Sequence, residues 1–152
     1  MKMLPAIVLA LAFAGPAFAD DAMSVANQIN QKWVAASDNR DAAAWTALYS
    51  TEGSVLPEGV SEPIIGQANI RKFFDKLVAG PKPENFTTTV SEAARLDPKT
   101  NFATGTYAFD SPGRNGSASR HHTGMYLGIA VLEESTWKIR SNIWNEMSPP
   151  NK

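Results

Sequence analysis

Three segments in the first half of the chain repeat apolar residues at helical spacing. The first covers residues 23–37, and its apolar face consists of Val25, Ile29 and Trp33. The third is the clearest, because its stripe is uninterrupted and lies between Gly66 and Gly80, residues suited to the ends of a helix. That stripe consists of Ile70, Phe73, Phe74, Leu77 and Val78. The pattern predicts two well-defined amphipathic helices.

A further helix is expected between these two. Asp41 is a suitable N-cap residue for it, because its side chain can accept a hydrogen bond from the first helical turn. Its predicted apolar face consists of Trp45, Leu48 and Tyr49. Short extended pieces near Val55 and Ile64 should follow, separated by a turn at residues 57–59.

The second half of the chain changes to a strand-like pattern rich in threonine, valine and aromatic residues. Strands are predicted over residues 86–96, 100–109, 121–133 and 137–144. Residues 110–119 are rich in serine, glycine and proline, and we expect an exposed loop there. Helices first and antiparallel strands second indicate an α+β fold. Three helices must then lie on one face of a curved sheet, which leaves room for a pocket between them.

The N-terminal segment has the pattern of a secretory signal peptide. Lys2 is followed by an apolar run over residues 3–14, which is broken at Gly15. Residues 17–19 read Ala-Phe-Ala, the small-x-small pattern of a cleavage site. The alternative is a buried helix or a membrane anchor, but the run is shorter than the about 20 apolar residues that cross a bilayer. We therefore expect residues 1–19 to be a cleaved signal peptide.

Cleavage after Ala19 would release residues 20–152 as one domain, located in the periplasm or secreted. The chain contains no cysteine, which excludes disulfides and thiolate chemistry. Its formal net charge of −1 is not the strong positive charge that is typical of nucleic-acid-binding proteins. No second apolar run is long enough to span a membrane, and no cofactor or metal site is expected.

Two groups of residues resemble one known superfamily. The first group is Trp33, Val34, Ala35, Ala36, Asp41, Trp45, Leu48, Tyr49, Ile65, Gly66, Ile70 and Phe73. The second is Gly105, Thr106, Tyr107, Trp137, Lys138, Ile139, Asn142, Ile143, Trp144 and Asn145. In order and spacing they resemble the SnoaL-like and ketosteroid-isomerase-like branch of the nuclear transport factor 2-like superfamily, closest to its uncharacterised exported members. The resemblance implies a conical barrel of three N-terminal helices on a curved, mostly antiparallel sheet, a pocket, and frequent homodimerisation through the sheet.

The resemblance does not carry over the residues of the isomerase reaction. Its catalytic tyrosine position falls on Trp33, and its general-base position falls on Pro57. Indole is only a hydrogen-bond donor, and proline has no side-chain proton acceptor. The remaining aspartic acid position falls near Gly128. Ketosteroid isomerase activity is therefore not expected, although a one-residue slip would bring Glu58 to the base position.

His121 and His122 are the only histidines of the chain. Successive side chains on a strand point to opposite faces, so the two rings are not expected to share a metal ion. If even-numbered residues face the pocket, His122 lies inside with Tyr126 and is a candidate general acid or base. The alternative is a solvent-facing or structurally hydrogen-bonded histidine.

The resemblance also places alternate residues of the last strand in the pocket. These are Arg140, Asn142 and Trp144, with Ile139, Ser141 and Ile143 on the other face. The full set of expected cavity residues is Trp33, Tyr49, Phe74, His122, Tyr126, Arg140, Asn142 and Trp144. Asn142 stands out because an amide can orient a ligand inside an aromatic pocket. Alternatively, the aromatic members are core and the polar members are solvated at the rim.

Three functions remain open from the sequence. The first is an exported protein that binds a small apolar or aromatic molecule. The second is an isomerase, cyclase or dehydratase that uses His122. The third is an interaction module that works through the outer face of the sheet. That face would carry Met125, Leu127, Ile129 and Val131, an apolar set that predicts a homodimer.

Overall fold

The computed structural model describes residues 17–113 and 118–147, with side chains from residue 21 onward. The helices are α1 (Ala17–Asn39), α2 (Ala42–Ala47) and α3 (Gln67–Ala79). The strands are β1 (Tyr49–Leu56), β2 (Ile64–Ile65), β3 (Glu84–Asp97), β4 (Thr100–Ser111), β5 (Arg120–Glu133) and β6 (Thr136–Glu146). The predicted signal peptide lies outside the described residues, apart from residues 17–19, which belong to α1. The middle of the predicted loop, residues 114–117, also lies outside them.

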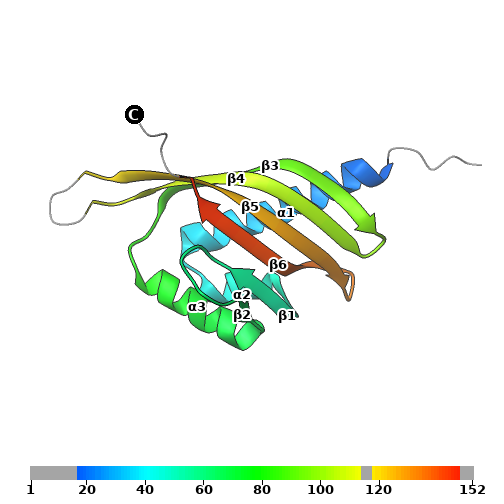
Figure 1. Ribbon diagram of the computed structural model, residues 1–152, viewed down its shortest axis with the longest axis horizontal. Coiled ribbons are helices and arrows are strands. Elements are labelled where there is room, and N and C mark those ends of the chain that lie inside the picture. The colour runs from blue at the N-terminus through cyan, green and yellow to red at the C-terminus, as the bar shows by residue number, and fades with distance from the viewer. Residues whose placement is uncertain (1–16, 114–117, 148–152) are drawn as a thin grey trace, which may run out of the picture.

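One sheet of six strands forms the body of the fold, in the order β2-β1-β6-β5-β4-β3. All neighbours are antiparallel except β1 and β6, which run parallel. Figure 1 shows the three helices on one side of this curved sheet, with α1 running along it and α2 and α3 beside β1. The α+β prediction is confirmed, and so is the expected layering of helices on one face.

The predicted start of α2 and both predicted ends of α3 agree with the structure. Asp41 caps α2, because its carboxylate accepts a hydrogen bond of 2.9 Å from the backbone N–H of Ala44. Gly66, at φ 81°, precedes α3, and Gly80 follows it. The described part of α1 is longer than predicted and begins at Ala17.

The end of α2 was predicted wrongly. Leu48 and Tyr49 were expected on the helix, but the helix stops at Ala47 and Tyr49 begins β1. The cause is tertiary: the backbone N–H of Ile139 donates to the carbonyl of Leu48 at 2.7 Å, and Tyr49 pairs with Ile139. Pairing with β6 therefore replaces the last helical turn that the local apolar spacing favours.

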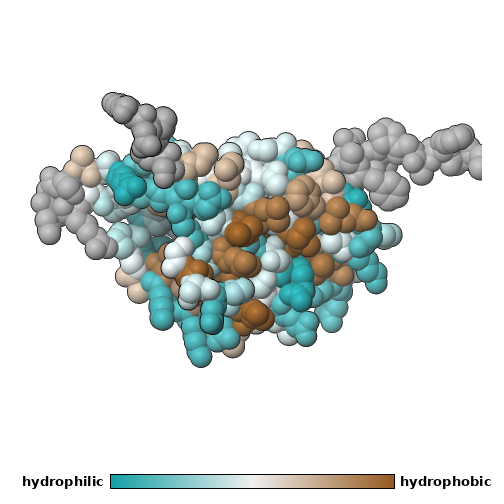
Figure 2. Space-filling model, in the orientation of Figure 1, coloured by the Kyte–Doolittle hydropathy of each residue, from teal (hydrophilic) through white to brown (hydrophobic). Residues whose placement is uncertain are grey.

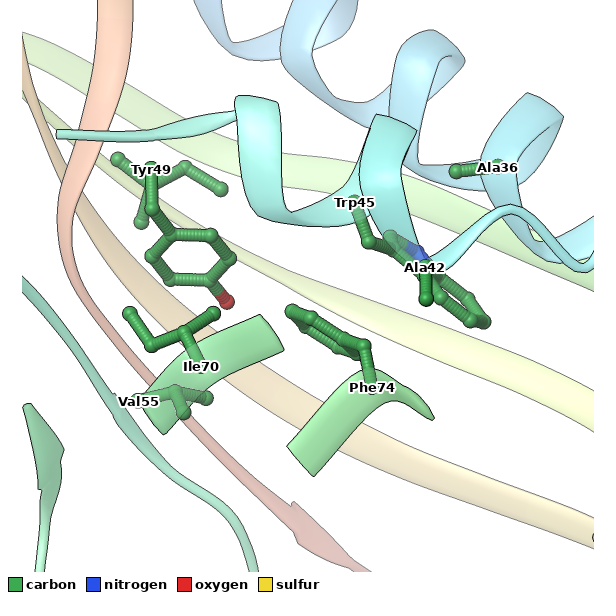
Figure 3. Close-up of a cluster of buried hydrophobic side chains, with 8 residues drawn as sticks. Ala36, Ala42, Trp45, Tyr49, Val55, Ile70 and Phe74 are labelled. Carbon is green, nitrogen blue, oxygen red and sulfur yellow. The ribbon is translucent and has the colours of Figure 1, made fainter. Parts of the chain in front are cut away.

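A solid aromatic cluster lies where α2 and α3 meet β1 (Figure 3). Its large members are Trp45, Tyr49, Val55, Ile70, Phe74 and Ile139, all 4% exposed or less. The rings of Trp45 and Phe74 stack with their centroids 5.1 Å apart. We call this set the packed cluster, and it anchors α3 to the sheet through apolar burial.

The outer face of the sheet carries no helix and exposes apolar side chains. Figure 2 shows a hydrophobic band across this face, over β5 and β6. Met125, Leu127 and Ile143 are 49%, 37% and 45% exposed. Of the predicted outer set, Val131 is only half-buried, whereas Ile129 is among the residues that line the inner cavity. Among the described residues no helix is long and apolar enough to span a bilayer.

Candidate ligand-binding site

A cavity of about 570 Å³ lies between α1, α3 and the inner face of the sheet. The helices and their connections line it with Ala26, Ile29, Asn30, Trp33, Ser37, Arg40, Trp45, Pro57, Glu58, Val60, Phe73, Leu77, Val78, Pro81 and Pro83. The sheet contributes Phe86, Thr88, Asn101, Ala103, Tyr107, Phe109, Ser111, Tyr126, Gly128, Ile129, Ala130, Ile139, Asn142, Trp144 and Glu146. Both the volume and the mainly apolar wall are typical of a small-molecule site.

Trp33 connects the cavity to the packed cluster. It lies on α1, and its ring centroid is 5.7 Å from that of Phe74 in the cluster. On the cavity side the same ring lies 5.8 Å from Trp144 of β6, in an edge-to-face arrangement. The cluster therefore holds the orientation of one aromatic wall of the cavity.

Two glycines on adjacent strands allow two tyrosines to lie flat against the sheet. Gly105 pairs with Tyr126, and Gly124 pairs with Tyr107. A Cβ on Gly105 would come within 2.6 Å of the Tyr126 ring, and one on Gly124 within 2.1 Å of Tyr107. Such distances are far inside van der Waals contact. Each ring occupies space that any other residue opposite it would fill, which explains how both tyrosines reach the cavity wall.

The two tyrosines differ in their electrostatic surroundings. Burial, together with the carboxylates of Glu58 and Glu146, raises the pKa of Tyr107 to about 12. Burial also raises the pKa of Tyr126, although a hydrogen bond of 2.8 Å from Asn30 opposes this effect. Both phenols are therefore neutral hydrogen-bonding groups near pH 7.

A β-bulge in β6 changes which side chains face the cavity. Ile129 pairs with Ser141 and Ala130 pairs with Ile139, so Arg140 has no partner residue on β5. The bulge shifts the alternation by one residue. Ile139 therefore lines the cavity before it, and alternate residues from Asn142 onward line it afterwards.

The predicted cavity residues have four different placements in the structure. Trp33, Tyr126, Asn142 and Trp144 line the cavity. Tyr49 and Phe74 do not, because both are 0% exposed within the packed cluster. Arg140 points outward at the bulge and donates to the carbonyl of Glu52, so its predicted place in the cavity is wrong. His122 is not among the lining residues, but its ring stacks on that of Phe109, which is, with the centroids 4.6 Å apart. As ligand contacts these residues remain predictions.

The positions onto which the resemblance placed the isomerase residues all lie at the cavity. Trp33, Pro57 and Gly128 are among its lining residues, and none has a side chain that can take up a proton. Glu58, next to Pro57, also lines the cavity, and its carboxylate accepts a hydrogen bond from the backbone N–H of Glu146. A carboxylate is therefore present beside the expected base position.

Three polar side chains form a connected group at one end of the cavity, which we call the rim cluster: Ser111, His122 and Glu146. The hydroxyl of Ser111 lies 2.8 Å from Nε2 of His122. Nδ1 of the same ring lies 2.9 Å from Oε1 of Glu146. Arg120 also donates to this carboxylate oxygen at 3.2 Å. His122 thus has partners at both ring nitrogens, and its side chain is only 12% exposed.

The rim cluster fixes the protonation pattern of the neutral imidazole. An ionised carboxylate only accepts hydrogen bonds, so Nδ1 of His122 carries the proton that faces Glu146. Nε2 is then an acceptor, and the hydroxyl of Ser111 must be the donor to it. The arrangement presents a hydroxyl hydrogen-bonded to a base that is itself oriented by a carboxylate.

His121 has separate partners, as strand alternation predicts. Its Nδ1 lies 2.7 Å from Oδ1 of Asp110, and the His121 side chain is 64% exposed. Hydrogen bonds from Asn85 and His121 lower the pKa of Asp110. Within residues 17–113 and 118–147, no group of three or more histidine, aspartate or glutamate side chains is arranged to hold a metal ion.

Some buried polar atoms in the cavity wall have no hydrogen-bond partner among the described residues. They are Oγ of Ser37, Nε1 of Trp45 and Oδ1 of Asn101. Ser37 and Asn101 are 1% exposed and Trp45 is 4% exposed. Leaving such groups unpaired costs free energy, so a bound molecule or water that hydrogen-bonds to them is favoured.

Sequence reasoning missed several residues of the wall and rim. Tyr107, Phe109 and Ser111 alternate along β4 and all line the cavity. Their spacing of two was a usable signal, but the strand was predicted to end at Phe109 and Ser111 was assigned to a loop. Glu146 lies two residues beyond Trp144 on the same face, past the predicted end of the last strand.

The chain matches one family of domains over most of its length. The sequence profile of the SnoaL-like domain matches residues 26–142. None of the curated proteins matches the chain.

Solved structures with the same fold come from several bacteria. A ketosteroid isomerase-like protein from Erwinia carotovora atroseptica superposes with a TM-score of 0.74 at 11% identity, covering 86% of this chain and 99% of that one. An NTF2-like superfamily protein from Salmonella enterica serovar Typhimurium gives 0.68 at 13% identity, covering 87% and 95%. An NTF2-like protein of unknown function from Shewanella oneidensis gives 0.63 at 14% identity, covering 80% and 96%. At these identities the likeness establishes the fold alone.

Proposed function

The chain belongs to the SnoaL-like domain family, and we propose that its cavity binds a small, mainly apolar or aromatic molecule. The observation that carries this proposal is the cavity of about 570 Å³ between α1 and the sheet. Its wall combines aromatic rings with a few polar groups. Apolar contacts with such a wall stabilise the bound ligand, and the polar groups orient it through hydrogen bonds.

The polar groups define what the ligand should carry. Oγ of Ser37 is both donor and acceptor, whereas Nε1 of Trp45 is a donor only. Both are buried and unpaired among the described residues. A ligand with an apolar body and at least one oxygen or nitrogen acceptor therefore fits the wall better than a pure hydrocarbon does.

Fluorescence titration with N-phenyl-1-naphthylamine, a neutral apolar dye, tests the proposal. We expect saturable binding of one dye per chain. In a Gly128→Leu variant the new side chain would project into the cavity, since a Cβ there meets only Asn142 at 3.6 Å. Affinity should fall by about tenfold or more, the equivalent of about 1.4 kcal/mol.

Gly128→Ala is the matched control, because one methyl group is accommodated at ordinary contact distance. It should bind the dye nearly as the wild type does. Equal affinity in Gly128→Leu, with folding intact, would refute binding in this cavity. Native mass spectrometry of the purified protein would then identify a natural ligand that co-purifies.

We also propose that the protein acts outside the cytoplasm, in the periplasm or secreted. The support is the sequence of residues 1–19, with its basic start, apolar run and small-residue cleavage pattern. Expression of the full chain in a bacterium, followed by fractionation and N-terminal sequencing, tests this. Asp20 is the expected first residue, and an intact N-terminus in the cytoplasmic fraction would contradict the proposal.

A homodimer through the outer face of the sheet is a separate proposal. It is supported by the exposed apolar side chains of Met125, Leu127 and Ile143 on that face. Light scattering at micromolar concentration should give twice the mass of one chain, and Leu127→Lys should give a monomer. A wild-type monomer under these conditions would refute the dimer.

A further inference from the structure

We infer that the rim cluster is a nucleophile, base and carboxylate set for hydrolysing esters of apolar or aromatic acids. Ser111 would be the nucleophile, His122 the general base, and Glu146 the residue that positions the histidine. The inference rests on the proposed function in one respect only, namely that the acyl group of the substrate occupies the cavity.

The distances meet the requirements of an activated serine. Oγ of Ser111 lies 2.8 Å from Nε2 of His122, and Nδ1 lies 2.9 Å from the Glu146 carboxylate. Both values fall within the roughly 2.6–3.2 Å that links a nucleophile, its base and the group that orients the base. The serine hydroxyl also lies 3.4 Å from the carbonyl of Arg120, a longer and weaker contact than the one to His122.

Ser54 provides an internal contrast. Its hydroxyl lies 3.0 Å from the hydroxyl of Ser141 and 3.5 Å from the carbonyl of Arg140. Neither of these groups can take a proton at neutral pH, so Ser54 is hydrogen-bonded without being activated. Ser111 differs from it because its partner is an imidazole nitrogen with a free lone pair.

Rigid elements hold the rim cluster in place. Its members come from three consecutive strands of the sheet, β4, β5 and β6, near the same end. Phe109 stacks on the imidazole of His122 at a centroid distance of 4.6 Å and an interplanar angle of 7°. Ring rotation would break the stack and both hydrogen bonds, so the base is held in position before any substrate arrives.

The position of the cluster selects the substrate. Ser111 and Glu146 both line the cavity, so an acyl group attached to the serine would extend toward the aromatic wall. The side chain of Glu146 is 33% exposed, so this end of the cavity reaches solvent and gives the alcohol part a way out. An ester with an apolar acyl part and a more polar alcohol part fits this arrangement.

The reaction balances with water as the second reactant. Oγ of Ser111 attacks the ester carbonyl carbon and its proton passes to Nε2 of His122. The bond to the alcohol oxygen breaks, and the alcohol leaves with that proton. Water then attacks the acyl-serine and gives a proton to His122, the acid is released, and the proton returns to Ser111.

The test is covalent labelling of the full-length wild-type protein with an alkyl fluorophosphonate. Oγ of Ser111 would form a bond to phosphorus and fluoride would leave, which adds a fixed mass that peptide mapping can locate. We expect one label per chain, at Ser111. Absence of labelling, or labelling only at another residue, would overturn the inference without any variant being needed.

Variants of the three rim-cluster residues test the role assigned to each of them. Ser111→Ala should abolish labelling, and His122→Gln should slow it by about 100-fold or more, as expected when a general base is lost. With p-nitrophenyl butyrate as substrate, Glu146→Gln should lower kcat and leave KM nearly unchanged. The control Ser54→Ala should label at the wild-type rate, and equal rates in His122→Gln and wild type would contradict the role of the base.

A parallel titration with N-phenyl-1-naphthylamine separates the two proposals. If the dye binds but Ser111 is not labelled, the hydrolytic inference fails and the binding function stands. If the dye binds and slows labelling of Ser111, both are supported, because the dye then occupies the space of the acyl group. Labelling without any dye binding would support the serine chemistry and contradict binding in the cavity.

Discussion

Aromatic rings lie on both sides of Trp33, but on one side they pack tightly against each other and on the other side they surround an open cavity. On the side of α2 and α3, rings meet rings and Phe74 is 0% exposed (Figure 3). On the side of β4 to β6, rings of comparable size enclose a cavity of about 570 Å³. Phe73 and Phe74 are neighbours in sequence, yet the first lines the cavity and the second lies in the packed cluster.

Small residues explain the difference. Ala26 of α1 and Ala103 and Ala130 of the sheet line the cavity and are 3%, 8% and 5% exposed. Gly128 lies beside them and contributes no side chain. In the packed cluster, large side chains of the helices meet large side chains of β1. Aromatic residues therefore do not by themselves ensure a filled core. The size of the side chains that face them determines whether a cavity remains.

The largest expected effect is on the packed side. Phe74→Ala removes a ring with contacts on every side and should lower the free energy of unfolding by about 3–5 kcal/mol. Phe73→Ala removes a half-buried ring at the cavity, and we expect roughly half that loss. Urea unfolding of both variants measures the difference, and equal losses would contradict the contrast between the two sides.

The glycine and tyrosine pairs should give the next largest effect. In Gly124→Ala the new methyl group would lie 2.1 Å from the ring of Tyr107, which must then move from its place. We expect a loss of stability of about 1–3 kcal/mol and weaker dye binding. Gly128→Ala is the control and should change stability by no more than about 0.5 kcal/mol. Similar unfolding curves for the two variants would count against the tight pairing.

The cap of α2 should contribute a smaller amount. Asp41→Ala removes the hydrogen bond to the backbone N–H of Ala44 and should cost about 1 kcal/mol. Asp38→Ala, an exposed change near the end of α1, should alter stability by no more than about 0.5 kcal/mol. Thermal unfolding compares them. A neutral Asp41→Ala would show that the capping hydrogen bond does not stabilise α2.

The smallest effects are expected in the titration of the tyrosines. Burial holds the pKa of Tyr49 well above its ordinary value, and the pKa of Tyr107 rises from 10.0 to about 12. The phenolate signal of the folded protein should therefore appear at higher pH than in urea. Glu58→Gln should lower the pKa of Tyr107, whereas Glu62→Gln should not.

The sign of the stability change follows from the direction of the pKa shift. For Tyr107 the folded state holds its proton more tightly than the unfolded state does. Its contribution to stability is therefore complete below about pH 10 and is lost as the pH rises toward about 12. Stability that increased over this range would contradict the burial of the phenol.

Most of the fold could be predicted because its signals are local. The apolar stripe of α3 and the glycines at its ends lie within one short segment, and so does the cap at Asp41. The change to alternating strands was equally clear. The end of α2 was not predictable in the same way, because Tyr49 joins β1 through pairing with Ile139, which is far away in sequence.

The candidate site was harder to predict because it depends on register. The resemblance placed Arg140 in the cavity together with Asn142 and Trp144, and the bulge in β6 turns it outward. Tyr49 and Phe74 were assigned to the cavity on residue type, which does not reveal what lies opposite. Ser111 and Glu146 lie at strand ends, where boundaries are uncertain by a few residues. Asn142 lines the cavity as the resemblance implied, because it lies beyond the bulge, whereas His122 is not among the lining residues.

The tryptophan indole N–H signals in a two-dimensional NMR spectrum test the central claim most directly. Trp33, Trp45 and Trp144 line the cavity, whereas Trp137 lies outside it beneath the guanidinium of Arg95. On addition of N-phenyl-1-naphthylamine we predict that the three cavity signals shift and that the Trp137 signal stays in place. Unchanged cavity signals at saturating dye, or a shift of Trp137 alone, would contradict an open ligand site between α1 and the sheet.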